Sequence, residues 1–249
     1  PTPTPTPSET PKPKPKKPKK PVAVTLNGSG FDTCAAPSLR AMRAWRGAFD
    51  AANIYIGGAA RACGYGNLSR TWVREVKKMG WHLIPTYVGF QAPCAPFRTR
   101  MTASRAAAQG RASADDAIER ARHFGLPKGV PIYFDMEAYD SRNDSCRRAV
   151  LLFLDAWSER LKDRGYTSGV YSSAAAAARD LGRSVGIRLP DSIWFAHWDG
   201  RASVWDSPYL SNKWWSKRQR IKQYRGPHRE KHGGYTLTID SNRVYGHVW

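Results

Sequence analysis

Acidic residues are scarce in this chain, whose 249 residues include 20 Asp and Glu against 40 Lys and Arg and therefore carry a net charge of +20. No apolar run approaches about 18 residues, so no segment of the sequence is expected to span a membrane. A G-x-S-x-G elbow and a G-x-x-x-x-G-K-[ST] loop are both missing, which removes the usual signatures of serine hydrolysis and of nucleotide-phosphate binding. The few carboxylates are therefore the informative side chains.

The sequence also lacks a convincing metal site. His228 and His232 lie four residues apart, as in a helical zinc site, but Glu230 is in the wrong position for an H-E-x-x-H motif. Pro227 before them and two glycines after them would break a helix. The cysteines form no C-x-x-C pair. We therefore predict no metal and no cofactor.

The four cysteines are expected to form two disulfides, because an even number beside a Pro/Thr/Lys-rich segment is typical of an oxidising compartment. Each cysteine follows a predicted strand, so all four should gather at one end of the fold. Neighbouring loops pair most easily. Among the three connectivities that four cysteines allow, we favour Cys34 with Cys63 and Cys94 with Cys146. The protein is expected to be secreted or associated with the cell wall.

The positive charge indicates a polyanionic partner. Residues 1–21 are typical of an extended Pro/Thr/Lys-rich tether; their six Lys and one Glu give +5, leaving +15 of the +20 on residues 22–249, the predicted folded domain. Bacterial cell wall and nucleic acid both attract cations, but no helix-turn-helix, zinc-finger or RNP-like motif accompanies the basic stretch 217–225. We expect a monomer with a cell-wall partner, and nucleic-acid binding is the less favoured hypothesis.

Short apolar runs alternate with helical segments over residues 22–249. Eight strands with helices between most of them predict a single (β/α)8 barrel of the TIM type, with an open doubly wound sheet as the competing fold. The last connection resembles a loop, so the final repeats are expected to be irregular. The predicted strands cover residues 22–32, 53–58, 81–88, 132–137, 168–171, 193–196, 221–224 and 235–240. The predicted helices cover residues 37–45, 67–80, 103–124, 146–164 and 174–181.

The apolar strand at residues 132–137 ends in two carboxylates. Asp135 and Glu137 are two residues apart, so they project to the same face of the strand. Repulsion and burial should raise at least one pKa, as a proton donor working near neutral pH requires. In a barrel, functional side chains lie at the carboxyl ends of strands, and Asp32 and Asp240 end the first and last predicted strands. Four acids are therefore expected around one mouth, unless they cap a helix or pair with arginines.

Aromatic, amide and imidazole side chains are predicted at equivalent strand ends. Aromatic faces cover the apolar C–H surface of a sugar ring, while amides and acids bind its hydroxyls. This combination favours polysaccharide chemistry. The predicted substrate-binding residues are Tyr55, Tyr87, Tyr171, Trp194, His197, Trp198, Gln223 and Tyr224.

Four motifs follow the order seen in glycoside hydrolase family 25 lysozymes. They are Gly30-Phe31-Asp32, Tyr133-Phe134-Asp135-Met136-Glu137, Gln223-Tyr224 and Ile239-Asp240-Ser241-Asn242. Residues 30–38 and 81–89 more closely resemble the Rv2525c-like glycoside-hydrolase-like domain family (DUF1906), which occurs in secreted actinobacterial proteins. The resemblance covers most of residues 24–246. It implies a secreted protein that acts on cell-wall glycan, with peptidoglycan as the expected substrate.

The resemblance also implies a role for each acid. Glu137 would protonate the glycosidic oxygen, and Asp135 would stabilise the oxocarbenium-like centre or orient the attacking group. Asp32 and Asp240 would shape the subsite and tune those pKa values. The alternative is a barrel that binds wall polysaccharide without cutting it. For an active enzyme on N-acetylated sugars, we favour the substrate's own N-acetyl group as nucleophile.

Overall fold

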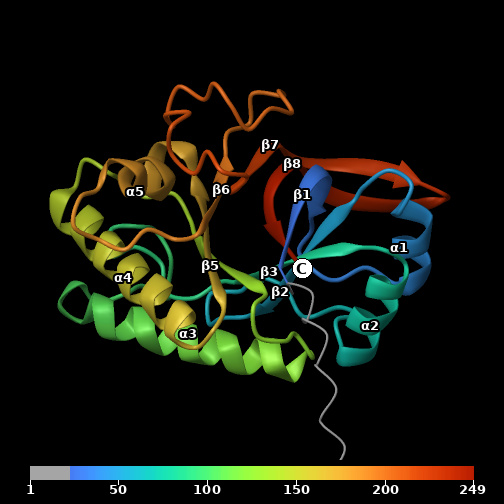
Figure 1. The fold of residues 1–249 in the computed structure, drawn as a ribbon, viewed down its shortest axis with the longest axis horizontal. Helices are drawn as coiled ribbons and strands as arrows, with labels where there is room; N and C mark the ends of the chain where they lie inside the picture. Colours follow the sequence, from blue (N-terminus) through green and yellow to red (C-terminus); the bar gives the residue numbers. More distant parts are fainter. Residues whose placement is uncertain (1–22) are drawn as a thin grey trace, which may run out of the picture.

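The computed structural model describes residues 23–249, which close into a barrel of eight strands in the order β1 to β8 (Figure 1). The predicted tether, residues 1–21, lies outside the described residues. The strands are β1 (Val24–Asp32), β2 (Ala51–Gly57), β3 (His82–Tyr87), β4 (Pro131–Met136), β5 (Thr167–Ser173), β6 (Ser192–Ala196), β7 (Arg220–His232) and β8 (Tyr235–Val248). The helices are α1 (Leu39–Trp45), α2 (Arg70–Lys78), α3 (Ala106–His123), α4 (Asp144–Asp163) and α5 (Arg179–Arg183), with a 3₁₀ turn at Ala103–Arg105 and a π-helical turn at Ala174–Ala178.

The direction of the last strand distinguishes this barrel from a regular (β/α)8 barrel. Strands β1 to β7 pair in parallel, whereas β8 is antiparallel to both β7 and β1. A closed α/β barrel and an irregular last repeat are thus confirmed, and the competing open sheet is excluded by closure. Gly233 and Gly234, with φ of 52° and 86°, form the turn that reverses the chain between β7 and β8.

The β7–β8 hairpin is longer than the sequence pattern predicted. Beyond the barrel, the two strands pair only with each other, from His228 opposite Ile239 to His232 opposite Tyr235. This arm reaches over α1 (Figure 1), where the Trp45 indole N–H donates to the Tyr235 carbonyl at 3.1 Å. Residues 228–232 of the arm are all charged or imidazole side chains, so no apolar alternation marks the strand after residue 224 although β7 continues to His232.

Side chains of the barrel strands alternate between two apolar clusters. One cluster fills the barrel and includes Ile84, Tyr133 and Trp194, whereas the other lies between the strands and helices and includes Phe134. Tyr133 therefore points inward and Phe134 outward, so Asp135 points inward again. The alternation that fills the barrel also directs the first acid of β4 into it.

No helix separates β6 from β7; residues 197–219 form a loop instead. Two basic side chains lie buried on the β7 face that a helix would otherwise cover. Arg220 donates to the carbonyls of Val204, Ser211 and Trp214, and Lys222 contacts Asp199 at 2.7 Å. The loop is thus held to the barrel by hydrogen bonds and an ion pair where the other repeats use apolar contacts.

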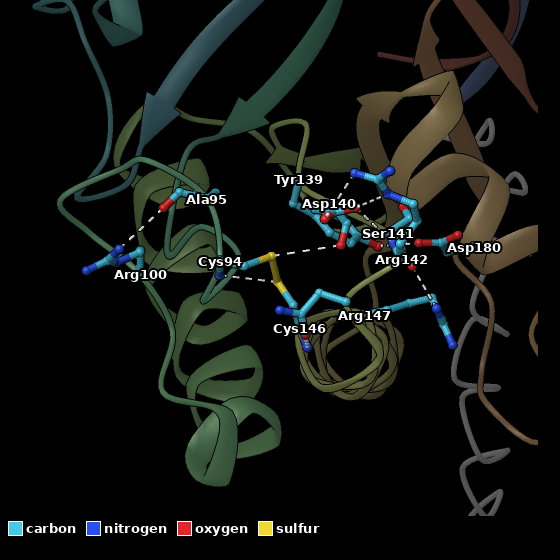
Figure 2. Close-up of a disulfide and its surroundings, with 11 residues drawn as sticks. Cys94, Ala95, Arg100, Tyr139, Asp140, Ser141, Arg142, Cys146, Arg147 and Asp180 are labelled. Carbon is cyan, nitrogen blue, oxygen red and sulfur yellow. Dashed lines mark hydrogen bonds and ion pairs between the residues drawn. A yellow bond between two sulfur atoms is a disulfide. The ribbon is translucent and has the colours of Figure 1, made fainter.

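Both predicted disulfides are confirmed, and both lie at the same end of the barrel. Cys34 at the end of β1 bonds to Cys63 in the loop after β2, and Cys94 after β3 bonds to Cys146 in the first turn of α4. Figure 2 shows the second bridge beside Asp140, which precedes α4. No helix in residues 23–249 is long and apolar enough to cross a membrane.

Replacing Cys94 and Cys146 together by Ser is expected to lower the free energy of unfolding by roughly 2–4 kcal/mol, because the bridge closes a long loop in the unfolded chain. The sequence separation between the two cysteines is 52 residues. Denaturant titration of the oxidised wild type and the double variant measures the difference. Equal midpoints and slopes for the two proteins would contradict a stabilising role for this bridge.

Candidate functional site

Four carboxylates surround one cavity of about 570 Å³ at the mouth of the barrel. Asp32 is the last residue of β1, Asp135 lies near the end of β4 and Glu137 follows that strand. Asp240 of β8 pairs directly with Asp32 in the ladder. All four line the cavity, so the structure brings together the four acids that the sequence singled out.

Asp240 reaches the mouth for a different reason from the one expected. The sequence pattern predicts Asp240 at the end of a parallel strand. In the structure, β8 enters at the mouth and runs antiparallel to β1, so Asp240 lies where the strand joins the barrel. The strand then continues from the mouth to the opposite end at Val248.

Asp32 is buried and receives hydrogen bonds from two amides. The Gln223 side-chain amide donates to both carboxylate oxygens at 3.0 and 3.1 Å, and the Asn242 amide donates to Oδ2 at 2.5 Å. Burial raises the pKa of Asp32 well above its ordinary value, and the charge of Asp240 raises it further, against the lowering effect of the amides. Asn242 is itself oriented by the Trp194 indole, which donates to its side-chain oxygen at 2.8 Å.

Asp135 is a buried acid with a carboxylate oxygen that has no partner within residues 23–249, and the half-buried Asp240 has one as well. Only 4% of the surface of Asp135 is exposed, and its Oδ1 atom has no hydrogen-bond partner among the described residues. Burial raises its pKa well above the ordinary value, and the charges of Glu137 and Asp32 add to the effect. A carboxyl in such surroundings favours its protonated form or a hydrogen-bonding ligand.

Glu137 is half-buried at the cavity wall. Burial raises its pKa, and the charge of Asp240 raises it further. Gln91 fixes the backbone here, because its amide donates to the Asp135 carbonyl and accepts from the Glu137 N–H, both at 2.9 Å. Gln91 is not predicted by the sequence, because it belongs to no recognised motif and lies on the loop after β3.

Tyr171, Trp198 and Gln223 form a hydrogen-bonded group beside these acids. The Tyr171 hydroxyl and the Trp198 indole donate to the Gln223 side-chain oxygen at 3.1 and 2.8 Å. Both donors fix the orientation of the amide that holds Asp32. Trp198 is 59% exposed and therefore offers an open aromatic face, whereas Tyr55 lines the cavity with its hydroxyl pKa raised by burial and by the four carboxylates.

Tyr55 is the one predicted substrate-binding residue that lines the cavity. The group of Tyr171, Trp198 and Gln223 does not line it, and neither do the four remaining predicted residues. Trp194 is buried inside the barrel beneath Asn242, and the Tyr87 hydroxyl donates to Asp116 of α3 at 2.7 Å, on the outer face of the barrel. His197 packs against the ring of Tyr209. The fourth is Tyr224, which is half-buried. The alternation of side chains along β3 explains the position of Tyr87. Ile84 fills the barrel, so Thr86 also points inward and Tyr87 points outward.

The cavity also has lining residues that the sequence analysis did not select. They include Phe97, Gln91 and Arg61, which lie on the loops after β3 and β2. Each loop is anchored by one disulfide. Loop position depends on these tertiary links and not on local sequence periodicity. Within residues 23–249, no group of three or more His, Cys, Asp or Glu side chains is arranged to hold a metal ion.

Three solved structures show the same fold. An uncharacterized B. stearothermophilus protein matches with 18% identity and a TM-score of 0.58, over 87% of this chain and 95% of that one. The Clostridium perfringens spore cortex lytic enzyme SleM matches with 14% identity and a TM-score of 0.60, over 91% and 68%. The Streptococcus pneumoniae autolysin LytC matches with 14% identity and a TM-score of 0.54, over 89% of this chain and 46% of that one, less than half of the autolysin chain.

No curated protein matches this chain. The model of one protein family does match, over residues 43–244, which include three of the four acids, β2 to β7 and most of β8. That family is described as an Rv2525c-like, glycoside hydrolase-like domain. The match extends over most of the sequence. The chain therefore belongs to the Rv2525c-like family of glycoside hydrolase-like domains.

Proposed function

We propose that this chain is a secreted glycoside hydrolase that cleaves cell-wall glycan, specifically peptidoglycan. The observation that carries the proposal is the pair Asp135 and Glu137, whose side chains line one cavity with raised pKa values. A glycosidase needs one carboxyl group that stays protonated to donate a proton and a second group that assists attack. A solved structure of the LytC autolysin contains a synthetic peptidoglycan ligand, which supports this choice of substrate by analogy of fold.

Glu137 is the proposed general acid, because it is half-buried at the cavity wall and burial raises its pKa. It donates its proton to the glycosidic oxygen as the bond to the anomeric carbon breaks. The substrate's acetamide oxygen attacks that carbon, and Asp135 accepts a hydrogen bond from the acetamide N–H. Water then opens the cyclic intermediate, while the Glu137 carboxylate accepts the proton of that water.

Asp32 and Asp240 tune the pair and do not react themselves. The charge of Asp240 raises the pKa of Glu137, and the charge of Asp32 raises that of Asp135. The amides of Gln223 and Asn242 hold Asp32 in place. The charge of Asp240 therefore helps to keep Glu137, the proposed proton donor, protonated at a higher pH than an isolated carboxyl group would allow.

Incubating the wild type with purified peptidoglycan and measuring muropeptide release tests the proposal. Release supports a hydrolase. Binding to several wall types without release would contradict the hydrolase proposal and indicate a domain that only binds the wall. The net charge of +20 would favour such binding, because the wall is polyanionic. Equal or tighter association with DNA, with an affinity that falls steeply with salt, would favour nucleic acid instead.

Asp240→Asn is expected to move the alkaline limb of the pH–rate profile to lower pH. The acid must be protonated, so activity is lost as pH rises through the pKa of Glu137. Removing the Asp240 charge removes one cause of the raised pKa of Glu137. The profile of kcat/KM against pH measures the shift. Asp163→Asn, at the end of α4, serves as the control; an unchanged or alkaline-shifted limb for Asp240→Asn would count against this coupling.

The first product anomer tests the acetamide route. A defined N-acetylated oligosaccharide should release a product that retains the anomeric configuration, since two displacements occur at the same carbon. NMR spectra recorded before mutarotation identify the anomer. An initially inverted product would exclude the acetamide route and indicate direct attack by water.

A further inference from the structure

Arg61 is the basic residue among the side chains that line the cavity of the four acids. It lies on the loop between β2 and α2, which is residues 58–69. Neither the family resemblance nor the mechanism above gives it a role. A cation on the wall of an acid-lined cavity would ordinarily form an ion pair with one of the acids.

The loop that carries Arg61 is fixed at several points. The Cys34–Cys63 bridge ties it to the end of β1. The Ala60 N–H donates to the Val88 carbonyl at 3.0 Å, and Asn67 donates from its backbone and side chain to the Ala36 carbonyl. Gly58, with φ of 109°, lies so close to Val88 that a Cβ atom would come within 2.0 Å of its carbonyl oxygen. The position of Arg61 is therefore built into the fold.

The guanidinium group of Arg61 stacks on the ring of Tyr65, 3.5 Å from its centroid. Within residues 23–249, it forms no ion pair of 4.0 Å or less, and its Nη1 atom is covered from water without a hydrogen-bond acceptor. Stacking on Tyr65 restricts the group without using its in-plane donors. The guanidinium therefore lines the cavity without an acceptor among the described residues, and an anionic ligand bound there would supply one.

We infer that Arg61 binds a carboxylate of the glycan held in the cavity, so that the protein selects an acidic glycan over a neutral one. This inference rests on the proposed function for the choice of ligand. The planar guanidinium matches a carboxylate with two parallel hydrogen bonds. Four neighbouring acids repel an anionic ligand, so a cation placed apart from them allows such a ligand to bind.

Two carboxylates of peptidoglycan have this chemistry. One is the ether-linked lactate on the sugar ring, which is free where the stem peptide has been removed. The other is the terminal carboxylate of the stem peptide. The two sources are distinguished by comparing glycan strands with free lactate, peptide-bearing strands and neutral N-acetylglucosamine oligomers. Strands whose lactate groups have been amidated provide a further neutral ligand of the same length.

Calorimetric titration of these ligands into Glu137→Gln protein, with and without Arg61→Gln, tests the inference. Arg61→Gln is expected to weaken binding of the carboxylate-bearing ligand by about 10- to 100-fold, the loss of one charged hydrogen-bonding group. Affinity for amidated strands and neutral oligomers should change less than about twofold. Arg111→Gln on α3 makes the same change in net charge away from the cavity and should leave all affinities unchanged.

An equal loss for acidic and neutral ligands, or no loss for either, would overturn the inference. Unchanged binding of the neutral oligomers shows that the variant cavity is intact; if Arg61→Gln does not fold, Arg61→Lys should show a smaller loss confined to acidic ligands. The outcome is independent of cleavage. Arg61-dependent binding without muropeptide release by the wild type would defeat only the hydrolase proposal, whereas release with no Arg61 dependence would defeat only this inference.

Discussion

Glu137→Gln is expected to lower the turnover of peptidoglycan by about 10²- to 10⁴-fold, the usual contribution of a positioned general acid. Gln has nearly the same shape but no proton that can be transferred to the leaving oxygen. The Gln91 contact at this position involves the Glu137 backbone N–H and is therefore retained. Initial rates of reducing-end formation measure turnover, and wall pull-down measures binding, which should stay within a factor of about two.

Glu119→Gln on the exposed face of α3 is the matched control, since it removes the same charge away from the cavity. It should leave turnover and binding unchanged. Equal activity of the Glu137→Gln variant and the wild type would contradict the assignment of Glu137 as the acid. Loss of both turnover and binding in the variant would indicate that Glu137 binds the glycan instead of protonating it.

Arg220→Met is expected to lower the free energy of unfolding by about 2–4 kcal/mol, because three buried carbonyls lose their donor. The side chain is fully buried and donates to Val204, Ser211 and Trp214. Burial lowers the pKa of Arg220 to about 10, so the buried charge itself costs free energy in the folded protein. Removing the charge recovers this cost, which offsets part of the stability lost with the hydrogen bonds. Met keeps the apolar stem but has no N–H group. Thermal unfolding should show a fall of roughly 5–15 °C in Tm.

Arg229→Met on the exposed side of the hairpin arm is the control and should change the Tm little. The loop 197–219 carries Trp198, whose indole contacts Gln223 beside Asp32. Arg220→Met should therefore also weaken glycan binding. A Tm equal to that of the wild type would show that the carbonyls of the loop find other donors, and that Arg220 does not hold the loop.

Three of the acids could be predicted from sequence because each is tied to a strand pattern, whereas Asp240 lies on a strand that runs in the opposite direction to the one expected. Asp135 and Glu137 continue the alternation that places Tyr133 inside the barrel, so their direction follows from the apolar residues before them. Asp32 likewise follows a recognisable first strand. Local periodicity of two residues was sufficient to orient these side chains.

Other features depend on contacts between distant segments. The reversal of β8 follows from the hairpin turn at Gly233 and Gly234. This hairpin could not be recognised from the sequence, because the charged residues before the turn do not resemble a strand. Gln91 and Arg61 reach the cavity on loops anchored by disulfides, and no local pattern marks them. Tyr87 was placed at the mouth because it ends a strand, but its side chain faces α3.

The most direct test of the central claim is digestion of purified peptidoglycan in water enriched in ¹⁸O. Hydrolysis by the acids of β4 breaks the glycosidic bond and adds one water oxygen to the new reducing end. Mass spectrometry should therefore find muropeptides that carry one ¹⁸O atom for each bond cut by the wild type, and at least about 100-fold less of this product from Glu137→Gln in the same time. Unlabelled products, or no product from the wild type while it still binds the wall, would contradict the account.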